Sequence, residues 1–479
     1  MEKDSTVLTI DCTNKLTRTM GNTGSELMHQ RLDRFRPEER PVIQGLFDRL
    51  LGGSPDRAQI GNSLSLGILQ SAVGSVIPDP MVQRIYRCLC SVDPGQVSGG
   101  SSGKSSSVSA AGVSRDQLVI FLADTLRGTA EERAPLVLAM SQNRGPPTAS
   151  VSCNQVIQFL QDLINAVIQI LVHRGRLQGW SSERMGDAPA GVKLLSEQMC
   201  SELKPTDEGC DRSCLEDWIF RVPSVCLYLE MVVSEGFDVS LGGRSAPTLL
   251  PPCTDTNWKE QRCLLDLPTV MFLAPQLPDR YSAPWRLVFS TKLHGESFTR
   301  MVTGLLKRGP TLLLIKDTKG HVFGGFAAQD WEIKPQFQGD SRCFLFTVSP
   351  SLRVYNTTGY NQHFMYLNQN QQTMPNGLGM GGQHNYFGLW LDCDFGRGHS
   401  RAKPKCTTYG SPQLSAEEDF TLDTVEVWAV GKLPEPEEDE EGPGKKSILN
   451  ADPEVQAIME MTGKTLHSQG LREPEEEEY

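Results

Sequence analysis

Apolar side chains recur at helical spacing through the first half of the chain. Three short segments between residues 35 and 140 each place their apolar residues on one face, which predicts amphipathic helices. A longer stripe from Val156 to Val172 has polar residues on its opposite face, which favours a core helix over a membrane span. A further helical pattern, Leu215 to Val233, is interrupted by Pro223. The pattern therefore predicts a helical lobe at 31–145 and a helical domain at 150–240. The apolar positions of the short helices are Val42, Ile43, Leu46, Phe47 and Leu50; Met81, Val82, Ile85, Tyr86 and Leu89; and Leu118, Phe121, Leu122 and Leu126.

The second and third short helices flank a Gly/Ser-rich stretch, Gly95 to Gly112, and so resemble an EF-hand lobe. A calcium loop needs oxygen ligands at positions 1, 3, 5 and 12 and a glycine at position 6. After Asp93, this stretch supplies Gly95, Val97 and serines at a stretched spacing. We therefore expect an EF-hand-like scaffold that holds no calcium, and we expect no other cofactor.

After Pro284 the period of the pattern changes from helix to strand. Alternating residues from Trp285 to Ser290 predict a strand, and Phe298 to Leu306 predict a helix that Ser297 caps. Two apolar runs joined by the turn Asp317–Gly320 predict a hairpin. Further strands are expected near 344–348, 386–391 and 425–430. The resulting fold class is α+β, with a two-sheet, sandwich-like domain at 266–431 that follows a Pro/Thr-rich linker at 241–265.

The net charge of −12 is concentrated near the C-terminus, where two acidic runs hold 11 carboxylates. The rest of the chain is close to neutral and offers no basic field for nucleic acid. We expect an acidic linker at 432–447, followed by a helix and acidic tail at 448–479. At the other end, residues 1–30 are polar and patternless, which predicts a disordered leader without a signal peptide. A cytoplasmic protein is therefore expected.

The cysteines fit that compartment. There are 13 of them, an odd number, and they are scattered among apolar residues, which is typical of buried thiols. Cys88 and Cys90 form one close pair, and Cys210 and Cys214 form another. Neither pair has histidines at ligand spacing, so we predict no structural metal.

Two short segments are candidates for attachment. Met20 to Ser25 fits the N-myristoylation pattern, which would acylate Gly21 if translation starts at Met20; a chance match is the alternative. After the acidic linker, Val455, Ile458 and Met459 lie on one face of a short predicted helix that Pro453 begins. Such a short helix has little stability alone, so its apolar face is expected to dock on this protein or on a partner.

Several residues of the β-rich part could carry chemistry. The block Gly377 to Gly382 is rich enough in glycine for a phosphate loop, but the following residues predict a strand, so a tight strand-entry loop is preferred. His384, Asp392, Cys393, Asp394 and His399 lie close together in sequence, and the two aspartates are expected on one strand face. No metal or nucleophile motif has this spacing, so no catalytic or metal site is predicted. His294 and Ser297 are expected to cap or pack.

Five ordered blocks in this part resemble the TLDc domain family: Trp285–Ser290 with the following His294–Phe298, Val322–Ala327, Phe344–Phe346, Gly377–Asp392 and Phe420–Val430. The helical first half, the start at Met20 and the tail around Lys446 to Pro453 resemble its mTOR-associated, lysosomal branch, related to nematode eak-seven. The resemblance implies a non-catalytic adaptor that binds subunits of the vacuolar ATPase, meets mTOR pathway proteins and lies on the cytoplasmic face of lysosomal membranes. A redox-protective enzyme of the oxidation-resistance type is the alternative.

Overall fold

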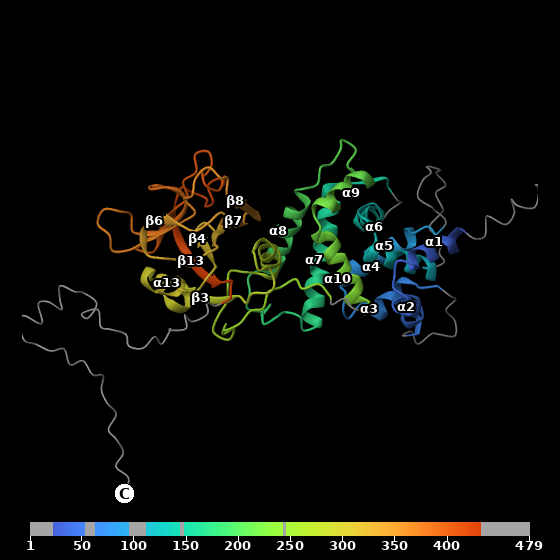
Figure 1. Cartoon of the computed structure of the whole chain (residues 1–479). Helices are drawn as coiled ribbons and strands as arrows, with labels where there is room; N and C mark the ends of the chain where they lie inside the picture. Colours follow the sequence, from blue (N-terminus) through green and yellow to red (C-terminus); the bar gives the residue numbers. More distant parts are fainter. Residues whose placement is uncertain (1–22, 53–62, 95–111, 144–147, 243–245, 433–479) are drawn as a thin grey trace, which may run out of the picture. The chain divides into compact units, whose positions relative to one another are not determined.

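The computed structural model describes residues 23–52, 63–94, 112–143, 148–242 and 246–432. They belong to one compact unit, which ends at Lys432. Gly21, Val455, Ile458 and Met459 lie outside the described residues, as does most of the Gly/Ser-rich loop. The helices lie in the first half and the strands in the second (Figure 1), which confirms the α+β class.

The first helices form two helix–loop–helix units whose loops pair with each other. One unit is α2 and α3, and the other is α4 and α5. Leu64 and Val113, one from each loop, exchange two backbone hydrogen bonds of 2.8 Å. Two hands joined by a short antiparallel bridge are the arrangement of an EF-hand pair. The sequence predicted one EF-hand-like unit in this lobe, and the structure has two, paired through their loops. The bounds are α1 (Thr23–Leu32), α2 (Arg40–Gly52), α3 (Leu66–Val73), α4 (Asp79–Ser91) and α5 (Arg115–Arg127).

The next helices repeat this arrangement, which the sequence did not suggest. Here the loops pair through β1 and β2, with Ser150 opposite Asp211 and Val151 opposite Cys210. The helical half is therefore built from two EF-hand-like pairs. The bounds are α6 (Ala130–Ser141), β1 (Ser150–Val151), α7 (Cys153–His173), α8 (Ala188–Cys200), β2 (Cys210–Asp211) and α9 (Arg212–Arg221).

Helix α10 (Ser224–Gly236) packs against both pairs, because it contacts α5 of the first and α7 of the second. Its start follows Pro223, which separates it from α9 as predicted. Gly236 lets the helix approach closely, since a Cβ there would lie 2.5 Å from Ile77. Helix α7 is long and apolar enough to cross a membrane by composition. Its buried face, however, packs against α8 and α10, which is the behaviour of a core helix.

The second half contains one antiparallel sheet that curls on itself. Strand β13 belongs to both halves of the sheet: β4 pairs along one edge of it, and the other edge pairs first with β12 and then, near its end, with β3. The strand order is β6-β9-β10-β11-β12-β13-β4-β5-β7-β8, with β3 beside β13. The two sheets expected from the sequence are thus halves of a single curled sheet. Their inner faces meet where Gly325 leaves room for Met380.

The strands are β3 (Arg286–Ser290), β4 (Thr311–Asp317), β5 (Val322–Ala327), β6 (Lys334–Gln338), β7 (Phe344–Ser349), β8 (Arg353–Asn356), β9 (Met365–Asn368), β10 (Gly377–Gln383), β11 (Tyr386–Asp392), β12 (Arg397–His399) and β13 (Asp419–Ala429). Short helical segments accompany them: α11 (Leu267–Leu273), η1 (Ala274–Gln276), α12 (Thr291–His294) and α13 (Phe298–Leu305). The predicted hairpin is β4–β5. Helix α13 begins after its predicted cap, because the Ser297 side chain accepts a hydrogen bond from the Arg300 N–H.

Candidate functional site

The four EF-hand-like loops share one local order of residues. Each bridge residue is followed by a helix N-cap, namely Ser65, Ser114, Ser152 or Asp211. Counting the bridge as position 8 of a calcium loop, position 12 falls three residues after the cap. That position normally supplies the bidentate glutamate. The residues there are Ile68, Gln117, Gln155 and Cys214.

The two glutamines at this position are engaged in capping. Gln117 Oε1 accepts from Ser114 N at 2.9 Å, and Gln155 Oε1 accepts from Ser152 N at 2.8 Å. Each pair closes a capping box at the start of the following helix. The side chain that would turn toward calcium thus stabilises the helix instead. The four hands serve as a scaffold, in which the carboxylate needed at position 12 is replaced.

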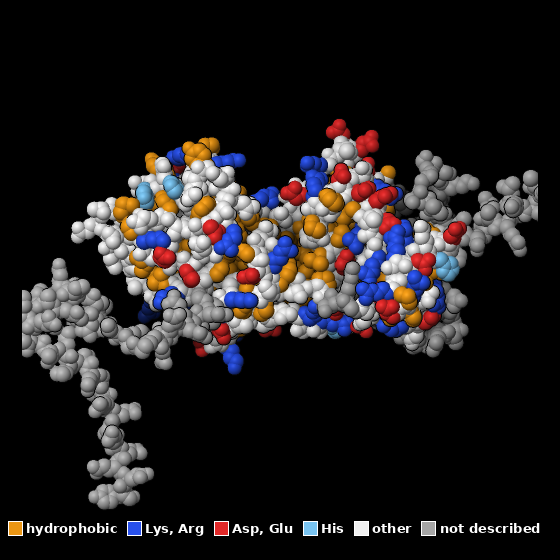
Figure 2. Space-filling model, in the orientation of Figure 1, with side chains coloured by type: hydrophobic (Ala, Val, Ile, Leu, Met, Phe, Trp, Pro, Cys, Tyr) orange, Lys and Arg blue, Asp and Glu red, His pale blue; other side chains and the backbone are white. Residues whose placement is uncertain are grey.

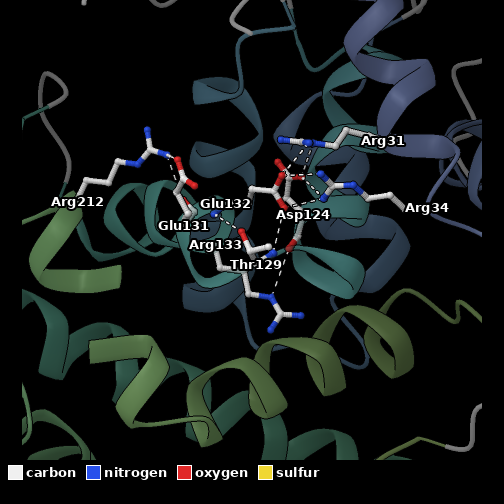
Figure 3. Close-up of polar contacts among 8 residues, drawn as sticks. All are labelled: Arg31, Arg34, Asp124, Thr129, Glu131, Glu132, Arg133 and Arg212. Carbon is white, nitrogen blue, oxygen red and sulfur yellow. Dashed lines mark hydrogen bonds and ion pairs between the residues drawn. The ribbon is translucent and has the colours of Figure 1, made fainter. Parts of the chain in front are cut away.

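An ion-pair cluster holds α1 against this scaffold (Figure 3). Arg31 Nε lies 2.7 Å from Asp124 Oδ1, and Arg34 donates to both oxygens of Glu132 at 2.6 Å. The hydrogen bond from Arg34 lowers the pKa of Glu132 to about 2, whereas burial raises the pKa of Asp124 to about 6. The two pKa values shift in opposite directions because Asp124 is more deeply buried than Glu132. Through Arg31, this cluster ties α1 (Thr23–Leu32) to α5 and α6.

Lysine and arginine side chains gather over these first helices, with acidic side chains between them (Figure 2). Many of them are paired: Arg40 with Asp33, and Arg115 with Asp48. The surface is therefore a mosaic of ion pairs rather than a uniform basic field.

Four tryptophans join the helical half to the sheet. Trp180 follows α7, and its ring centroid lies 6.0 Å from that of Trp258, 5.8 Å from Trp285 and 5.4 Å from Trp428. Its Nε1 donates to the carbonyl oxygen of Pro251 at 2.8 Å. We call these four residues the tryptophan joint. Trp180, Trp285 and Trp428 are almost fully buried, so the joint is a core between two parts of the chain and not a sliding surface.

The segment expected to be a linker, 241–265, takes part in this joint. Cys253 N donates to the Gln178 carbonyl at 2.7 Å, and Trp285 N donates to that of Pro252 at 2.7 Å. Leu249 and Leu250 are buried. The segment therefore connects the two halves through backbone hydrogen bonds and core contacts, as well as by the chain itself.

A buried carboxyl group lies at the edge of the joint. Glu426 of β13 is 1% exposed; its Oε1 accepts from Leu264 N at 2.9 Å and its Oε2 accepts from Trp428 Nε1 at 3.2 Å. Burial raises the pKa of Glu426 to about 7 despite these two donors. Its charge state therefore changes within the physiological range. The sequence pattern does not mark this residue, because Glu426 alternates with Val425 and Val427 as a solvent-facing strand residue would, whereas both faces of β13 are buried here.

The glycine block is a strand, β10, so the expectation of a strand-entry loop is wrong. Its glycines make room for stacked aromatic rings: a Cβ on Gly379 would lie 2.6 Å from the Phe387 ring, and one on Gly377 would lie 2.5 Å from the Trp390 ring. Phe387 and Trp390 stack with centroids 4.5 Å apart. Strand β11 follows through a tight turn at Asn385 with positive φ. A phosphate loop needs a following helix, so this block does not form one.

The predicted chemical residues are occupied with packing. His399 stacks on Trp390, and burial lowers its pKa to about 4. His384 lies beside Phe337 and its pKa is also lowered by burial. Asp392 accepts from Trp390 Nε1 at 2.5 Å. Asp394 falls after the end of β11, so the expectation that the two aspartates share a strand face is wrong.

The remaining candidates also have structural partners. His294 Nδ1 accepts from Ser290 N at 3.0 Å, and its ring stacks on Phe289. Cys393 is half-buried, and burial raises the pKa of its thiol. Both sequence expectations for His294 and Ser297, packing and capping, are met.

A cavity of about 560 Å³ opens beside the aromatic cluster. Within it, Arg401 pairs with Asp419 at 2.7 Å. Its charged lining therefore neutralises itself, and the aromatic rings form part of its wall. Its charged and aromatic lining comprises Phe387, Trp390, Asp392, Arg397, His399, Arg401, Asp419 and Phe420.

Three aromatic side chains are largely exposed among the described residues. Phe220 on α9 is 81% exposed and Tyr360 after β8 is 80% exposed. Tyr386, at the start of β11, is 58% exposed. These residues lie on both halves of the chain.

A curled antiparallel sheet with a glycine strand, docked through tryptophans to EF-hand-like pairs, defines a TLDc-domain protein. The TLDc domain model matches residues 258–431, beginning slightly before the predicted 266. The chain is 59% identical over 462 residues to the MTOR-associated protein MEAK7 of Danio rerio, covering 96% of this chain and 100% of that protein. It is 43% identical over 471 residues to the protein of that name in Homo sapiens, covering 96% and 100%. This chain belongs to the MEAK7 family.

A second group of relatives matches only in part. Oxidation resistance protein 1 of Bos taurus is 37% identical over 164 residues, which cover 33% of this chain and 18% of that protein.

Proposed function

We propose that this protein is a non-catalytic regulatory adaptor that binds the cytosolic sector of the vacuolar proton-pumping ATPase at lysosomes and supports mTOR signalling. The observation that carries the proposal is the full-length similarity to proteins named as mTOR-associated. The TLDc model accounts for 258–431 alone. The helical half is thus shared with these relatives and belongs to the function.

The tryptophan joint supports an adaptor role. An adaptor that transmits position must hold its two binding surfaces in a fixed relation, and the joint does so through buried rings and backbone hydrogen bonds. A flexible linker would instead allow relative motion of the parts. Because the segment at 241–265 is packed into this joint, the two halves are suited to bridge two partners.

The engaged state of the chemical residues also favours binding over catalysis. A general acid or base works best with a pKa near the operating pH and access to a substrate. His399 is held neutral by a pKa of about 4, and Asp392 is bonded to Trp390. These side chains stabilise the aromatic cluster.

Attachment to the lysosomal surface is proposed to use both ends of the chain. One myristoyl group on Gly21, formed if translation starts at Met20, would hold a membrane only weakly, so a second contact is required. The vacuolar ATPase would supply that contact. The predicted helix with Val455, Ile458 and Met459 would add a further grip, either on this protein or on the ATPase.

The test uses isolated lysosomes with the full chain and a variant that lacks residues 447–479. Both should co-purify with ATPase subunits, whereas the truncated form should have a weaker effect on ATP turnover. Intact mass spectrometry of the N-terminus would report the lipid. The exposed variant Phe220→Ala and its counterpart Tyr360→Ala then ask which half makes the contact. Failure of the full chain to co-purify with any ATPase subunit would refute the proposal.

A further inference from the structure

The second EF-hand-like pair contains four cysteines at the place where its loops meet. Cys153 is the first residue of α7, Cys200 is the last of α8, Cys210 lies in β2 and Cys214 lies in the first turn of α9. Val151 is paired with Cys210 across the bridge, which brings the start of α7 against β2. We call these residues the thiol cluster.

The Cys210 thiol is a neighbour of the Cys153 and Cys214 thiols, and the Cys200 thiol is a neighbour of the Cys153 thiol. Cys200 Sγ also lies 3.8 Å from the Cys153 carbonyl oxygen, and Cys214 Sγ donates to the Lys204 carbonyl at 3.1 Å. All four are unbridged thiols. Four thiols on three helices and a strand are thus gathered in one place by the fold.

Four neighbouring thiols can take part in two kinds of chemistry, metal binding and oxidation. A zinc cage requires its ligands at the corners of a tetrahedron around one point. Within the part of the chain that the structure describes, no group of three or more cysteine, histidine or acidic side chains has such an arrangement. Adjacent thiols that do not form a cage can still join in pairs. The geometry therefore favours oxidation.

The thiols differ in burial, and this difference indicates which one attacks the oxidant and which one resolves the product. Cys210 is fully buried and Cys200 is 7% exposed, and burial raises the pKa of Cys200 to about 12 and that of Cys210 further. Both remain protonated and are shielded from an oxidant. Cys153 is half-buried, so it is the thiol of the Cys153–Cys210 pair that an oxidant can reach. Cys153 is therefore the attacking thiol, and Cys210 is the neighbour that can resolve it.

We infer that the thiol cluster is a peroxide-sensitive site in which Cys153 and Cys210 form a reversible disulfide. In the first step the Cys153 thiolate attacks one peroxide oxygen, the O–O bond breaks, and Cys153 sulfenic acid and hydroxide form. In the second step the Cys210 thiol attacks the sulfenic sulfur, an S–S bond forms, and water leaves. The two thiols lose two electrons, which reduce the peroxide. A thiol reductant restores the starting state.

The disulfide would lock β1 and α7 to β2, because it would tie the two loops of the pair covalently. Burial raises the pKa of the Cys210 thiol, which attacks in the second step, so we expect the disulfide to form slowly and the site to respond to a sustained oxidant rather than to a brief pulse. It is independent of the proposed ATPase contact and of the TLDc domain.

The experiment uses the reduced full chain, treated with hydrogen peroxide and then alkylated and digested for peptide mass spectrometry. We expect a cross-linked peptide that joins Cys153 to Cys210, together with loss of both free thiols and their recovery with dithiothreitol. In Cys210→Ser, dimedone should trap the sulfenic acid on Cys153. Cys153→Ser, a change at a half-buried position, should abolish the cross-link, and the matched control Cys393→Ser should leave it unchanged.

Three results would overturn the inference. One is oxidation of the exposed Cys90 with no cross-link in the cluster. Another is a cross-link that persists in Cys153→Ser. The third is stoichiometric zinc in the purified chain by elemental analysis, which would make the cluster a metal site. Circular dichroism of each variant shows whether it still folds, so that loss of the cross-link can be distinguished from loss of structure.

Discussion

Replacing Glu426 by glutamine should remove a pH dependence from the stability of the joint. The pKa of Glu426 is raised from 4.5 to about 7 in the folded protein. The folded state therefore binds a proton that the unfolded state releases between these values. Its contribution to stability is fully present below about pH 4.5 and is lost as the pH rises through about 7. At 1.36 kcal/mol for each pKa unit, the loss is about 3 kcal/mol.

The assay is urea unfolding of wild type and Glu426→Gln from pH 5 to 8.5, followed by tryptophan fluorescence. In the variant, one of the two N–H groups that donate to Glu426 loses its acceptor. This loss should lower the free energy of unfolding by about 1–3 kcal/mol at every pH. The free energy of unfolding of the wild type should therefore fall relative to that of the variant as the pH rises. Burial also raises the pKa values of Asp124 and Asp266 to about 6, but both groups are present in each protein and cancel in the difference. The exposed control Glu296→Gln should follow wild type. A difference that is constant from pH 5 to 8.5 would refute the reasoning.

Three further substitutions test the rest of the structure. Trp180→Ala should cost about 3–5 kcal/mol and separate one calorimetric transition into two; a single unshifted transition would contradict the rigid joint. Gly379→Ala should cost about 1–3 kcal/mol, because its Cβ would lie 2.6 Å from Phe387, whereas Gly45→Ala in open helix should be neutral or stabilising in the same thermal melt. Gln155→Glu should keep the capping box yet bind no calcium by titration calorimetry, and millimolar or tighter binding would show that the loop is competent.

Periodicity predicted most helices and strands, because each buries one face of regular spacing. The second EF-hand-like pair was missed because its loops carry no ligand pattern and its bridge is only two residues long in each strand. The glycine strand was misjudged because its glycines serve rings on a neighbouring strand, a contact that local sequence does not contain. The tryptophan joint could not be predicted, since Trp180 and Trp428 lie far apart along the chain. Such sites depend on tertiary neighbours, whereas periodicity reports only the local face.

Strand β13 has a mechanical consequence. Its final residues, Glu426 to Ala429, are paired with β4 on one side and with β3 on the other, and the strand ends at Ala429. A pull on the segment that follows would load these bonds in shear, so that they resist together instead of opening one by one. The same strand contributes Trp428 to the joint. Tension applied beyond Ala429 would therefore reach the helical half through β13 and the ring contact between Trp428 and Trp180.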